Sequence, residues 1–399
     1  MTRAVVSLNS GSSSIKFALF RLDEAGTPIH AAGGKIEGIG TAPRIVARAD
    51  DGSIAWEQQW PDTGMTHEAL LHELFDWAVG HLGDNKVVAI GHRVVHGGMT
   101  FAKPVRIDDA LMEALEALCP LAPLHQPHNL AAIRAIAKLA PHLPQVACFD
   151  TAFHHDMPIV AARMALPRAM AERGYRRYGF HGLSYEYIAR HLRMVDPDLA
   201  KGRVITAHLG NGASMCAMHD CRSVDSTMGF TALDGLMMGT RTGSLDPGVV
   251  VHLVEQEGMT GPEIEKLLYR QSGLLGVSGI SSDMRELHAS DDPHAKEAIE
   301  LFAWRAARHA AALMTGLRGL DGLVFTAGIG ENDPIIRAMI CERLEWTGIT
   351  LDPEANARNA PVISTADSRI TVRVIPTDEE QMIALHSIAT LNLAQGVTA

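Results

Sequence analysis

Apolar and polar positions repeat along this chain with recognisable helical and strand periods. In residues 66–82, "THEALLHELFDWAVGHL", apolar side chains recur every three or four positions, which predicts a helix with one buried face formed by Leu70, Leu71, Leu74, Trp77 and Ala78. The same spacing predicts further helices over 108–118, 127–140 and 293–318. Residues 333–347 are also expected to be helical, with Gly348 as their C-terminal stop.

Continuous apolar runs that end in polar residues lie between these helices. "KVVAIGHRVVHGG" (86–98) and "PQVACFDTAFHH" (144–155) are typical of buried strands whose C-terminal ends carry chemistry. "DGLVFTAGIGEN" (321–332) predicts a strand followed by a glycine-rich turn. Strands that alternate with helices in this way indicate an α/β protein.

Two segments share one plan. "VVSLNSGSSSIKF" (5–17) and "RVITAHLGNGASMCAM" (203–218) both place a turn of Asn, Gly and Ser between two apolar runs, which predicts a hairpin in each case. One hairpin in each half of the chain fits a duplicated domain, with both turns facing a ligand in a cleft between the copies. A plain structural turn remains the alternative for each segment.

Composition narrows the class of protein. A chain of 399 residues exceeds the size at which one core usually stops growing, so two domains are expected. With 47% hydrophobic and 20% charged residues the chain is not of a disordered or fibrous class. The formal net charge of −11 argues against nucleic acid as a partner. An anionic substrate would have to be held by locally placed Arg, Lys or backbone N–H groups.

The expected location is the cytoplasm. The five cysteines form no CxxC pair and lie mostly in apolar surroundings, so we expect reduced thiols. The first strand pattern begins too early to leave room for a signal peptide, and no apolar run is long enough to cross a bilayer, so no membrane partner is expected.

Common catalytic signatures are absent from the sequence. GxxxxGK[ST], GxGxxG, HExxH and GxSxG do not occur, which disfavours a P-loop ATPase, a simple dinucleotide enzyme, a zincin and an α/β-hydrolase. Glycine- and hydroxyl-rich turns remain, whose backbone N–H groups could bind phosphate: "NSGSSS" (9–14), "HLGNG" (208–212), "SGISSDMR" (278–285) and "GIGEN" (328–332).

Two arginines lie in glycine-bracketed loops. Arg93 follows an apolar run, and Arg241 lies in "GLMMGTRTGSLDPG". The guanidinium fork matches a carboxylate or a phosphate in two-point contact, so both residues are candidates for an anion site. A structural ion pair is the alternative for each.

Acidic and imidazole groups supply further candidates. Asp150 ends a strand and could hold Mg²⁺, orient a nucleophile or cap a turn, and His181 could donate to phosphoryl charge or be structural. The pair His154 and His155 lacks zinc-site spacing and is interpreted as packing or surface. Residues 378–380 are either a solvated helix start or carboxylates for Mg²⁺.

Taken together, the motifs resemble the acetate kinase family of short-chain carboxylate kinases. The resemblance runs in order from Asn9 to Glu380 through "GHRVVHGG", "FDTAFH", "YGFHG", "HLGNGAS", "DGLMMGTR", "SSDMR" and "GIGEN". It implies duplicated actin-like, ribonuclease H-like ATPase domains with the nucleotide in the interdomain cleft. The implied first domain spans 1–150 plus 376–399, and the second, with nucleotide binding and dimerisation, spans 151–375.

The resemblance also implies an activity. The expected reaction is the reversible, Mg²⁺-dependent in-line transfer of the γ-phosphoryl group of ATP to acetate, with Mn²⁺ as an alternative metal and a homodimer as the assembly. By analogy, Arg93 and Arg241 would hold the carboxylate and the phosphoryl group, and Asp150 would orient substrate and metal. His181 would stabilise the transition state.

The remaining site residues follow from the same resemblance. Asn9 and Glu379 match the magnesium site. The residues expected to contact ATP are Lys16, His208, Leu209, Gly210, Asn211, Gly212, Asp283, Met284, Arg285, Gly328, Ile329, Gly330, Glu331 and Asn332.

The chain departs from the usual family motifs at several places. Ala232 replaces a Pro that lines the acyl pocket in relatives, and the smaller side chain is expected to admit propionate more readily. "LAPLHNP" is "LAPLHQP" here, "GFHGTSH" is "GFHGLSY", and "TNEE" is "TDEE". Two alternatives therefore stay open: a propionate kinase with the same mechanism, and a non-catalytic actin-fold nucleotide-binding protein. The sequence fixes neither the acyl preference, the physiological direction, the nucleotide, the oligomeric state nor the extent of domain closure.

Overall fold

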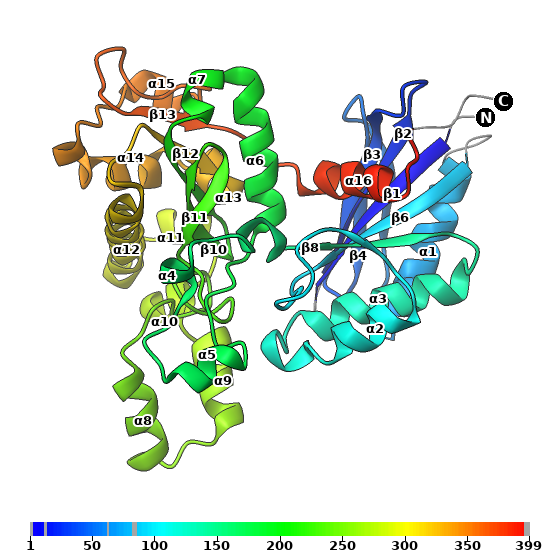
Figure 1. The fold of residues 1–399 in the computed structure, drawn as a ribbon, viewed down its shortest axis with the longest axis horizontal. Coiled ribbons are helices and arrows are strands. Elements are labelled where there is room, and N and C mark those ends of the chain that lie inside the picture. Colours follow the sequence, from blue (N-terminus) through cyan, green and yellow to red (C-terminus); the bar gives the residue numbers. More distant parts are fainter. Residues whose placement is uncertain (1–2, 12–13, 62–63, 82–85, 395–399) are drawn as a thin grey trace. The chain divides into compact units, whose positions relative to one another are not determined.

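The chain folds into two compact units. The computed structural model describes residues 3–11, 14–61, 64–81 and 86–394. Unit 1 comprises Met1–Ala152 and Asp378–Ala399, and unit 2 comprises Phe153–Thr377 (Figure 1). A 3₁₀ turn over Ala152–His154 links the two along the chain.

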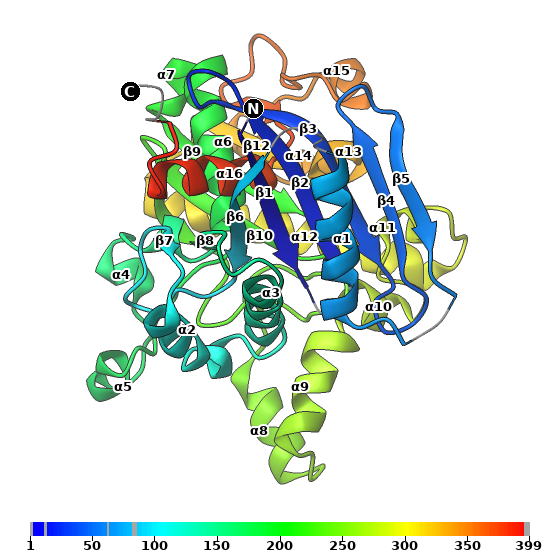
Figure 2. The same cartoon turned by 90° about the vertical axis from the view of Figure 1, so that its right-hand side faces the viewer.

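Unit 1 is built on a mixed sheet with the strand order β5-β4-β3-β2-β1-β6-β8-β7. The meander from β1 to β5 is antiparallel, whereas β6 is parallel to β1 and β8 is parallel to β6. Figure 2 shows the meander strands side by side, with α1 in front of them. The strands are β1 (Arg3–Ser10), β2 (Ser14–Leu22), β3 (Pro28–Glu37), β4 (Arg44–Ala49), β5 (Ile54–Gln59), β6 (Lys86–Val94), β7 (Val105–Arg106) and β8 (Gln145–Phe149).

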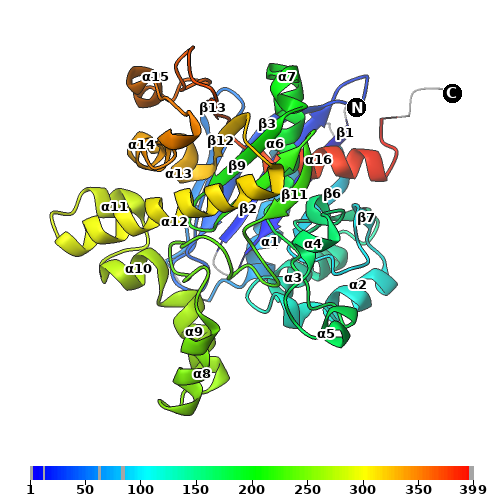
Figure 3. The same ribbon diagram turned by 60° about the vertical axis from the view of Figure 1, so that its left-hand side comes forward.

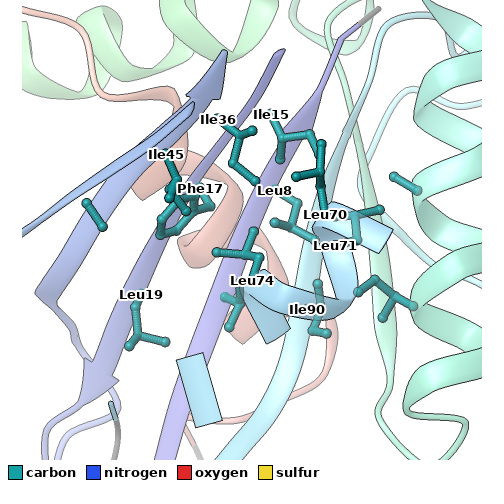
Figure 4. Close-up of a cluster of buried hydrophobic side chains, with 14 of the residues drawn as sticks. Leu8, Ile15, Phe17, Leu19, Ile36, Ile45, Leu70, Leu71, Leu74 and Ile90 are labelled. Atoms are coloured by element: carbon teal, nitrogen blue, oxygen red, sulfur yellow. The ribbon is translucent and has the colours of Figure 1, made fainter. Parts of the chain in front are cut away.

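Helices cover both faces of this sheet, because side chains of β1 alternate between two cores. Val6 and Leu8 lie in the cluster with α1 and α3, whereas Val5 packs with Ala384 and Ile388 of α16. In Figure 4, Leu70, Leu71 and Leu74 of α1 point toward the strands. The helices of unit 1 are α1 (His67–His81), α2 (Asp109–Glu116), α3 (Gln126–Leu139) and α16 (Glu379–Thr390), with a 3₁₀ turn over Cys119–Leu121.

The approach of α16 to the sheet depends on one glycine. A Cβ atom added to Gly91 of β6 would collide with the side chains of Ile383 and Ser387. The absence of a side chain at this position therefore lets α16 lie directly on β6 and β1. Figure 1 shows α16 beside these two strands.

Unit 2 repeats the central strand order on a smaller scale. Its sheet has the order β11-β10-β9-β12-β13, which matches β3-β2-β1-β6-β8 of unit 1 strand for strand. In both, an antiparallel hairpin begins the sheet and two parallel strands follow on the other side of its first strand. The strands are β9 (Arg203–Leu209), β10 (Ala213–His219), β11 (Arg222–Ser226), β12 (Gly322–Thr326) and β13 (Thr371–Val374).

Two large helices cover the sheet of unit 2. The long helix α12 packs along β9, β10 and β11, and α6 packs along β9, with the strands between them (Figures 1 and 3). The helices are α4 (Ile159–Ala162), α5 (Arg168–Glu172), α6 (Gly182–Val195), α7 (Pro197–Ala200), α8 (Pro247–Glu255), α9 (Gly261–Arg270), α10 (Gly273–Ser278), α11 (Met284–His288), α12 (Pro293–Leu317), α13 (Ala327–Asn332), α14 (Pro334–Glu342) and α15 (Pro353–Ala357), with a 3₁₀ turn over Glu345–Thr347.

Most of the elements expected from the hydrophobic pattern are present. Both hairpins form, and the helices expected over 66–82, 108–118, 127–140 and 293–318 are α1, α2, α3 and α12. Trp77 is only partly buried, because its ring stacks on Trp56 with centroids 5.5 Å apart rather than entering the core.

Two expectations for the last third of unit 2 are wrong. Residues 327–332 form the helix α13, not a turn, because Thr326 is extended and the chain enters the helix directly from β12. The helix expected over 333–347 ends at Glu342, since Leu344 leaves helical geometry with φ −108° and buries its side chain. Gly348, with φ 96°, ends the following 3₁₀ turn instead.

None of the described helices combines the length and the apolar character that crossing a bilayer requires.

Several histidines are buried in their neutral form. Burial lowers the pKa of His92, His96 and His154 to about 4. For His154, the carbonyl of Phe180 accepts from Nε2 at 3.0 Å, so Nδ1 accepts from the Ser223 hydroxyl at 2.8 Å. His154, the first residue of the pair, is therefore a buried packing residue.

These histidines predict acid sensitivity of the fold. Their folded-state pKa values lie below the ordinary value of 6.5, so the unfolded chain binds more protons between pH 6.5 and 4. Stability is complete above about pH 6.5 and falls by about 1.4 kcal/mol per pH unit for each such group as the pH is lowered toward 4. Urea unfolding midpoints at pH 7.5, 6.5 and 5.5 test this, and His154→Gln should show a shallower dependence. Equal slopes for both proteins would contradict the prediction.

Candidate functional site

Three polar residues of unit 1 meet where neighbouring parallel strands end. Asn9 lies near the end of β1, Arg93 near the end of β6, and Asp150 directly after β8. Because β1, β6 and β8 are adjacent and parallel, their C-terminal ends lie at one edge of the sheet.

Arg93 joins the other two residues. Its Nε donates to both oxygens of Asp150, at 3.0 and 3.1 Å, and Nη2 donates to Oδ2 at 2.5 Å. Its Nη1 donates to Oδ1 of Asn9 at 3.1 Å. Asp150 is 1% exposed and Arg93 19% exposed, so the pair is a two-point, largely desolvated ion pair whose arginine still reaches solvent.

Two buried side-chain amides of α3 form hydrogen bonds with the backbone of the loop that follows Arg93. Asn129 accepts from the N–H of Val95 at 3.0 Å and donates to the carbonyl of Ser10 at 2.7 Å, so it ties the end of β1 to the end of β6. Gln126 accepts from the N–H of His96 and donates to its carbonyl, both at 3.0 Å. The Gln that departs from the usual motif therefore pairs with both backbone groups of one residue.

The N-terminus of α16 adds negative charge to this edge of unit 1. Burial disfavours the charged guanidinium of Arg93, but Asp150, Glu379 and Glu380 outweigh this effect and raise the pKa of Arg93 above its ordinary value. Burial, and then the charge of Glu379, raises the pKa of Glu380. Asp378, the residue that departs from the "TNEE" motif, caps the helix by accepting from the N–H of Gln381 at 2.7 Å.

The donors present fit a magnesium ion only in part. Among the described residues, no three His, Cys, Asp or Glu side chains cluster closely enough to hold a metal by themselves. The amide oxygen of Asn9 and the carboxylates of Glu379 and Glu380 are hard oxygen ligands, which Mg²⁺ prefers. The oxygen of Asn9 already accepts from Arg93, so water and substrate phosphate would have to supply most of the shell of an ion held here.

Lys16 lies in a separate pocket of unit 1. This pocket, of about 330 Å³, is lined by Lys16, Lys35, His30, Asp378 and Glu380 over the backbone of β2 and β3.

In unit 2, the hairpin β9-β10 carries a second set of polar residues. The rings of His181 and His208 stack with centroids 4.1 Å apart and an angle of 18°. The hydroxyl of Ser214 lies 2.8 Å from Nδ1 of His181, and the hydroxyl of Ser184 lies 2.8 Å from Nδ1 of His208. Each imidazole is therefore held by a serine.

Arg241 lies in the loop before α8, beside the same hairpin. Its Nη1 donates to the carbonyl of Ala232 at 2.9 Å, and its Nη2 lies 3.9 Å from the position that a Cβ on Gly212 would take. The loop is held by Gly273, whose left-handed φ of 64° lets its backbone pass against Met238 and Arg241 where a side chain would clash.

A pocket of about 730 Å³ in unit 2 collects many of the residues expected to contact a nucleotide. The Nε of Arg285 donates to a carboxylate oxygen of Asp283 at 3.0 Å. The hydrogen bonds from Arg285 lower the pKa of Asp283 to about 2. The lining residues are Gly210, Asn211, Ser282, Asp283, Met284, Arg285, His288, Gly328, Ile329, Asn332, Asp333, Pro334 and Ile335.

Other expected residues lie outside the lining of this pocket. Leu209 is fully buried, and the carbonyl of Gly330 accepts from buried Arg337 at 2.9 Å. Glu331 accepts from the N–H groups of Ala327 at 2.7 Å and Thr377 at 3.1 Å, so its side chain fixes local backbone. His208 and Gly212 lie beside His181 instead.

Several contributors to these sites belong to none of the sequence motifs. His288 and Asp333 line the pocket as a pair, 2.8 Å apart, although they come from different helices and belong to no motif. Asn129 and Gln126 act through backbone groups far away in the sequence. The family motifs mark residues that are expected to contact a ligand, whereas these residues contact the protein backbone or each other.

Comparison with known proteins decides the family. The Acetokinase family profile matches residues 4–385. The chain belongs to the Acetokinase family. Among its relatives, the acetate kinase of Rhodopseudomonas palustris is 55% identical over 97% of this chain and 98% of its own length. That of Nitrobacter hamburgensis is 50% identical over 97% of this chain and 96% of its own length. The resemblance drawn from the motifs is thus confirmed.

Solved structures of the Acetokinase family confirm the fold. A propionate kinase from Francisella tularensis superposes with a TM-score of 0.89 at 39% identity, covering 97% of this chain and 99% of its own. The Porphyromonas gingivalis acetate kinase gives 0.84 at 37% identity, covering 98% and 100%. Together with the repeated strand order, this confirms the duplicated actin-like α/β fold.

The buried ion pair of unit 1 leads to a stability prediction. Asp150→Asn removes the charge partner of a desolvated arginine, so the free energy of unfolding should fall by about 3 kcal/mol. The matched control is Asp321→Asn, because Asp321 also pairs with one arginine, Arg203, but both are more than a third exposed. That change should cost below about 1 kcal/mol. Urea unfolding at pH 7.5 measures both, and equal losses would contradict the assignment of a desolvated pair.

Proposed function

We propose that this chain is an acetate kinase, which transfers the γ-phosphoryl group of ATP reversibly to the carboxylate of acetate. The observation that carries the proposal is the paired arrangement of arginine and polar groups at the strand ends of an actin-like fold within the Acetokinase family. Acetate is ionised at neutral pH, so its oxygen needs no base, and catalysis can rest on alignment and charge neutralisation.

Four side chains have proposed roles in binding and catalysis. Arg93, which keeps a solvent-accessible guanidinium while Asp150 fixes its orientation, binds the acetate carboxylate. Arg241 neutralises the transferring phosphoryl group, and His181 donates a hydrogen bond to its equatorial oxygens. Asp150 has a second role in orienting substrate and metal.

The proposal also assigns a nucleotide site and a metal site. The pocket of unit 2 is proposed to hold ATP, with Asp283, Met284, Arg285 and the start of α13 as contacts. Asn9 and Glu379 are proposed to hold Mg²⁺, or Mn²⁺ in its place. When bound, the ion would neutralise charge on the phosphates. Because the thiols are mostly buried and no described helix suits a bilayer, we place the enzyme in the cytoplasm.

A propionate kinase is the second candidate, and two observations favour it. Ala232 stands where relatives usually have Pro, and its carbonyl is bound by Arg241, so this position adjoins a proposed catalytic group. The structurally similar Francisella tularensis protein is a propionate kinase.

Acyl phosphate formation, trapped as the hydroxamate, tests the activity. Purified protein with Mg-ATP is given acetate, propionate or butyrate, with glycerol as the non-carboxylate control. We expect acetate to be preferred and Arg241→Ala to reduce kcat by several orders of magnitude while nucleotide binding is retained, because its charge acts on the transition state. Preference for propionate would establish the second candidate. ATP binding without any acyl phosphate would favour a non-catalytic nucleotide-binding protein.

We also propose that the chain forms a homodimer through α8 of unit 2. No residue of α8 is buried, and its apolar side chains Val249, Val251 and Val254 are 41%, 53% and 49% exposed. Val251 and Val254 lie three positions apart and so share one side of the helix, and exposed apolar side chains of this kind mark an interaction surface.

Light scattering at several concentrations tests this assembly. The double change Val251→Glu and Val254→Glu should convert the dimer into monomers, because it places charges on the apolar face. Val79→Glu is the matched control, since Val79 is 47% exposed in unit 1. A wild-type monomer, or a dimer unaffected by the double change, would refute the assignment of α8.

A further inference from the structure

Tyr185 lies one helical turn after His181 and reaches the serine that holds it. Its hydroxyl lies 2.5 Å from Oγ of Ser214, and that Oγ lies 2.8 Å from Nδ1 of His181. Tyr185 and Ser214 are both fully buried. The three groups therefore form a continuous hydrogen-bond chain that begins in the core between α6 and β9-β10 and ends at the imidazole.

The chemistry of the groups gives this chain a direction. A phenol is more acidic than an aliphatic alcohol, so Tyr185 donates to Ser214, and the single hydroxyl proton of Ser214 is left to donate onward to Nδ1 of His181. A neutral imidazole that accepts at Nδ1 carries its proton on Nε2. Nε2 lies 3.4 Å from the position that a Cβ on Gly212 would take, so this N–H faces the glycine turn between β9 and β10.

An imidazole and a guanidinium lie close to His181. His208 of β9 stacks on it at 4.1 Å, and Arg241 also approaches the Gly212 position, at 3.9 Å. The titratable and charged groups near the imidazole include His208, Arg241 and the phenol of Tyr185. A positive charge on His181 would be opposed by Arg241, so its tautomer decides whether Nε2 can donate.

We propose that Tyr185 is a positioning residue that acts through Ser214 to keep the proton of His181 on Nε2. This rests on the proposed function, in which His181 donates to the phosphoryl group. At position 185 the usual "GFHGTSH" motif has His, whereas this chain has Tyr. The phenol O–H therefore donates a hydrogen bond here that an imidazole N–H could donate at the same place.

Tyr185→Phe should lower kcat about tenfold at pH 8 and leave both KM values nearly unchanged, because one hydrogen bond no longer selects the tautomer. Ser214 can then accept from Nδ1–H, which leaves Nε2 without a proton. An imidazolium donates from both nitrogens, so the deficit should shrink as the pH is lowered and the ring becomes protonated. A purely packing role would give a deficit independent of pH.

Four variants serve as controls. Tyr185→His keeps a donor and should retain more activity than Tyr185→Phe. Ser214→Ala should resemble Tyr185→Phe, and the double variant should lose no more than either alone, because both changes break one chain. Tyr178→Phe removes a different buried phenol bond, from Tyr178 to the carbonyl of Gly174 at 2.9 Å, and should leave kcat and its pH profile unchanged.

A second readout separates this proposal from the proposed function. Ring nitrogen chemical shifts from ¹⁵N-labelled protein report the tautomer, with the His181 signals assigned by their loss in His181→Gln. We expect Nε2–H in the wild type and a shift toward Nδ1–H in Tyr185→Phe. Absence of acyl phosphate from the wild type would defeat the proposed function, whereas the nitrogen shifts would still test the chain. An unchanged tautomer together with a wild-type pH profile in Tyr185→Phe would overturn the role of Tyr185.

Discussion

The architecture depends on a parallel pairing next to the first strand of each hairpin. In unit 1, β6 pairs parallel with β1, and in unit 2, β12 pairs parallel with β9. Parallel neighbours end at the same edge of a sheet, so residues that follow them are brought together without any long loop. Asn9, Arg93 and Asp150 meet for this reason. Gly210, directly after β9, and Gly328, two residues after β12, line one pocket for the same reason.

A buried ion pair at such an edge is better explained by function than by stability. Desolvating Arg93 and Asp150 costs free energy that their attraction repays only with good geometry, and an apolar pair of similar volume is often as stable. The two-point contact and the Asn9 bond supply that geometry. What the pair adds is a guanidinium held in one orientation, with Glu379 and Glu380 favouring its charge. In the proposed function, a carboxylate substrate would meet a preformed partner, and the arginine side chain would lose little further freedom on binding.

Much of this was predictable from the sequence, and the exceptions have a common cause. The hairpins, the main helices and the strand-end positions of Arg93 and Asp150 follow from local patterns. The resemblance supplied the family. Gln126 and Asn129 could not be found in this way, because their partners are backbone groups separated from them by about 30 to 119 residues. Glu331 lies inside a motif, yet its side chain binds two backbone N–H groups, and only coordinates distinguish that use from ligand contact.

Two non-glycine residues with left-handed backbone lie beside the second hairpin turn. His181, with φ 57°, and Ala327, with φ 64°, are left-handed residues at the starts of α6 and α13, and each precedes a glycine. Such a conformation costs about 1 to 2 kcal/mol for a residue with a side chain. Ala327 lies beside Gly210 and His181 beside Gly212, so both strained positions flank the same turn. The starts of two helices therefore lie against one glycine turn, and the left-handed residues are retained because the surrounding packing over-determines their conformation.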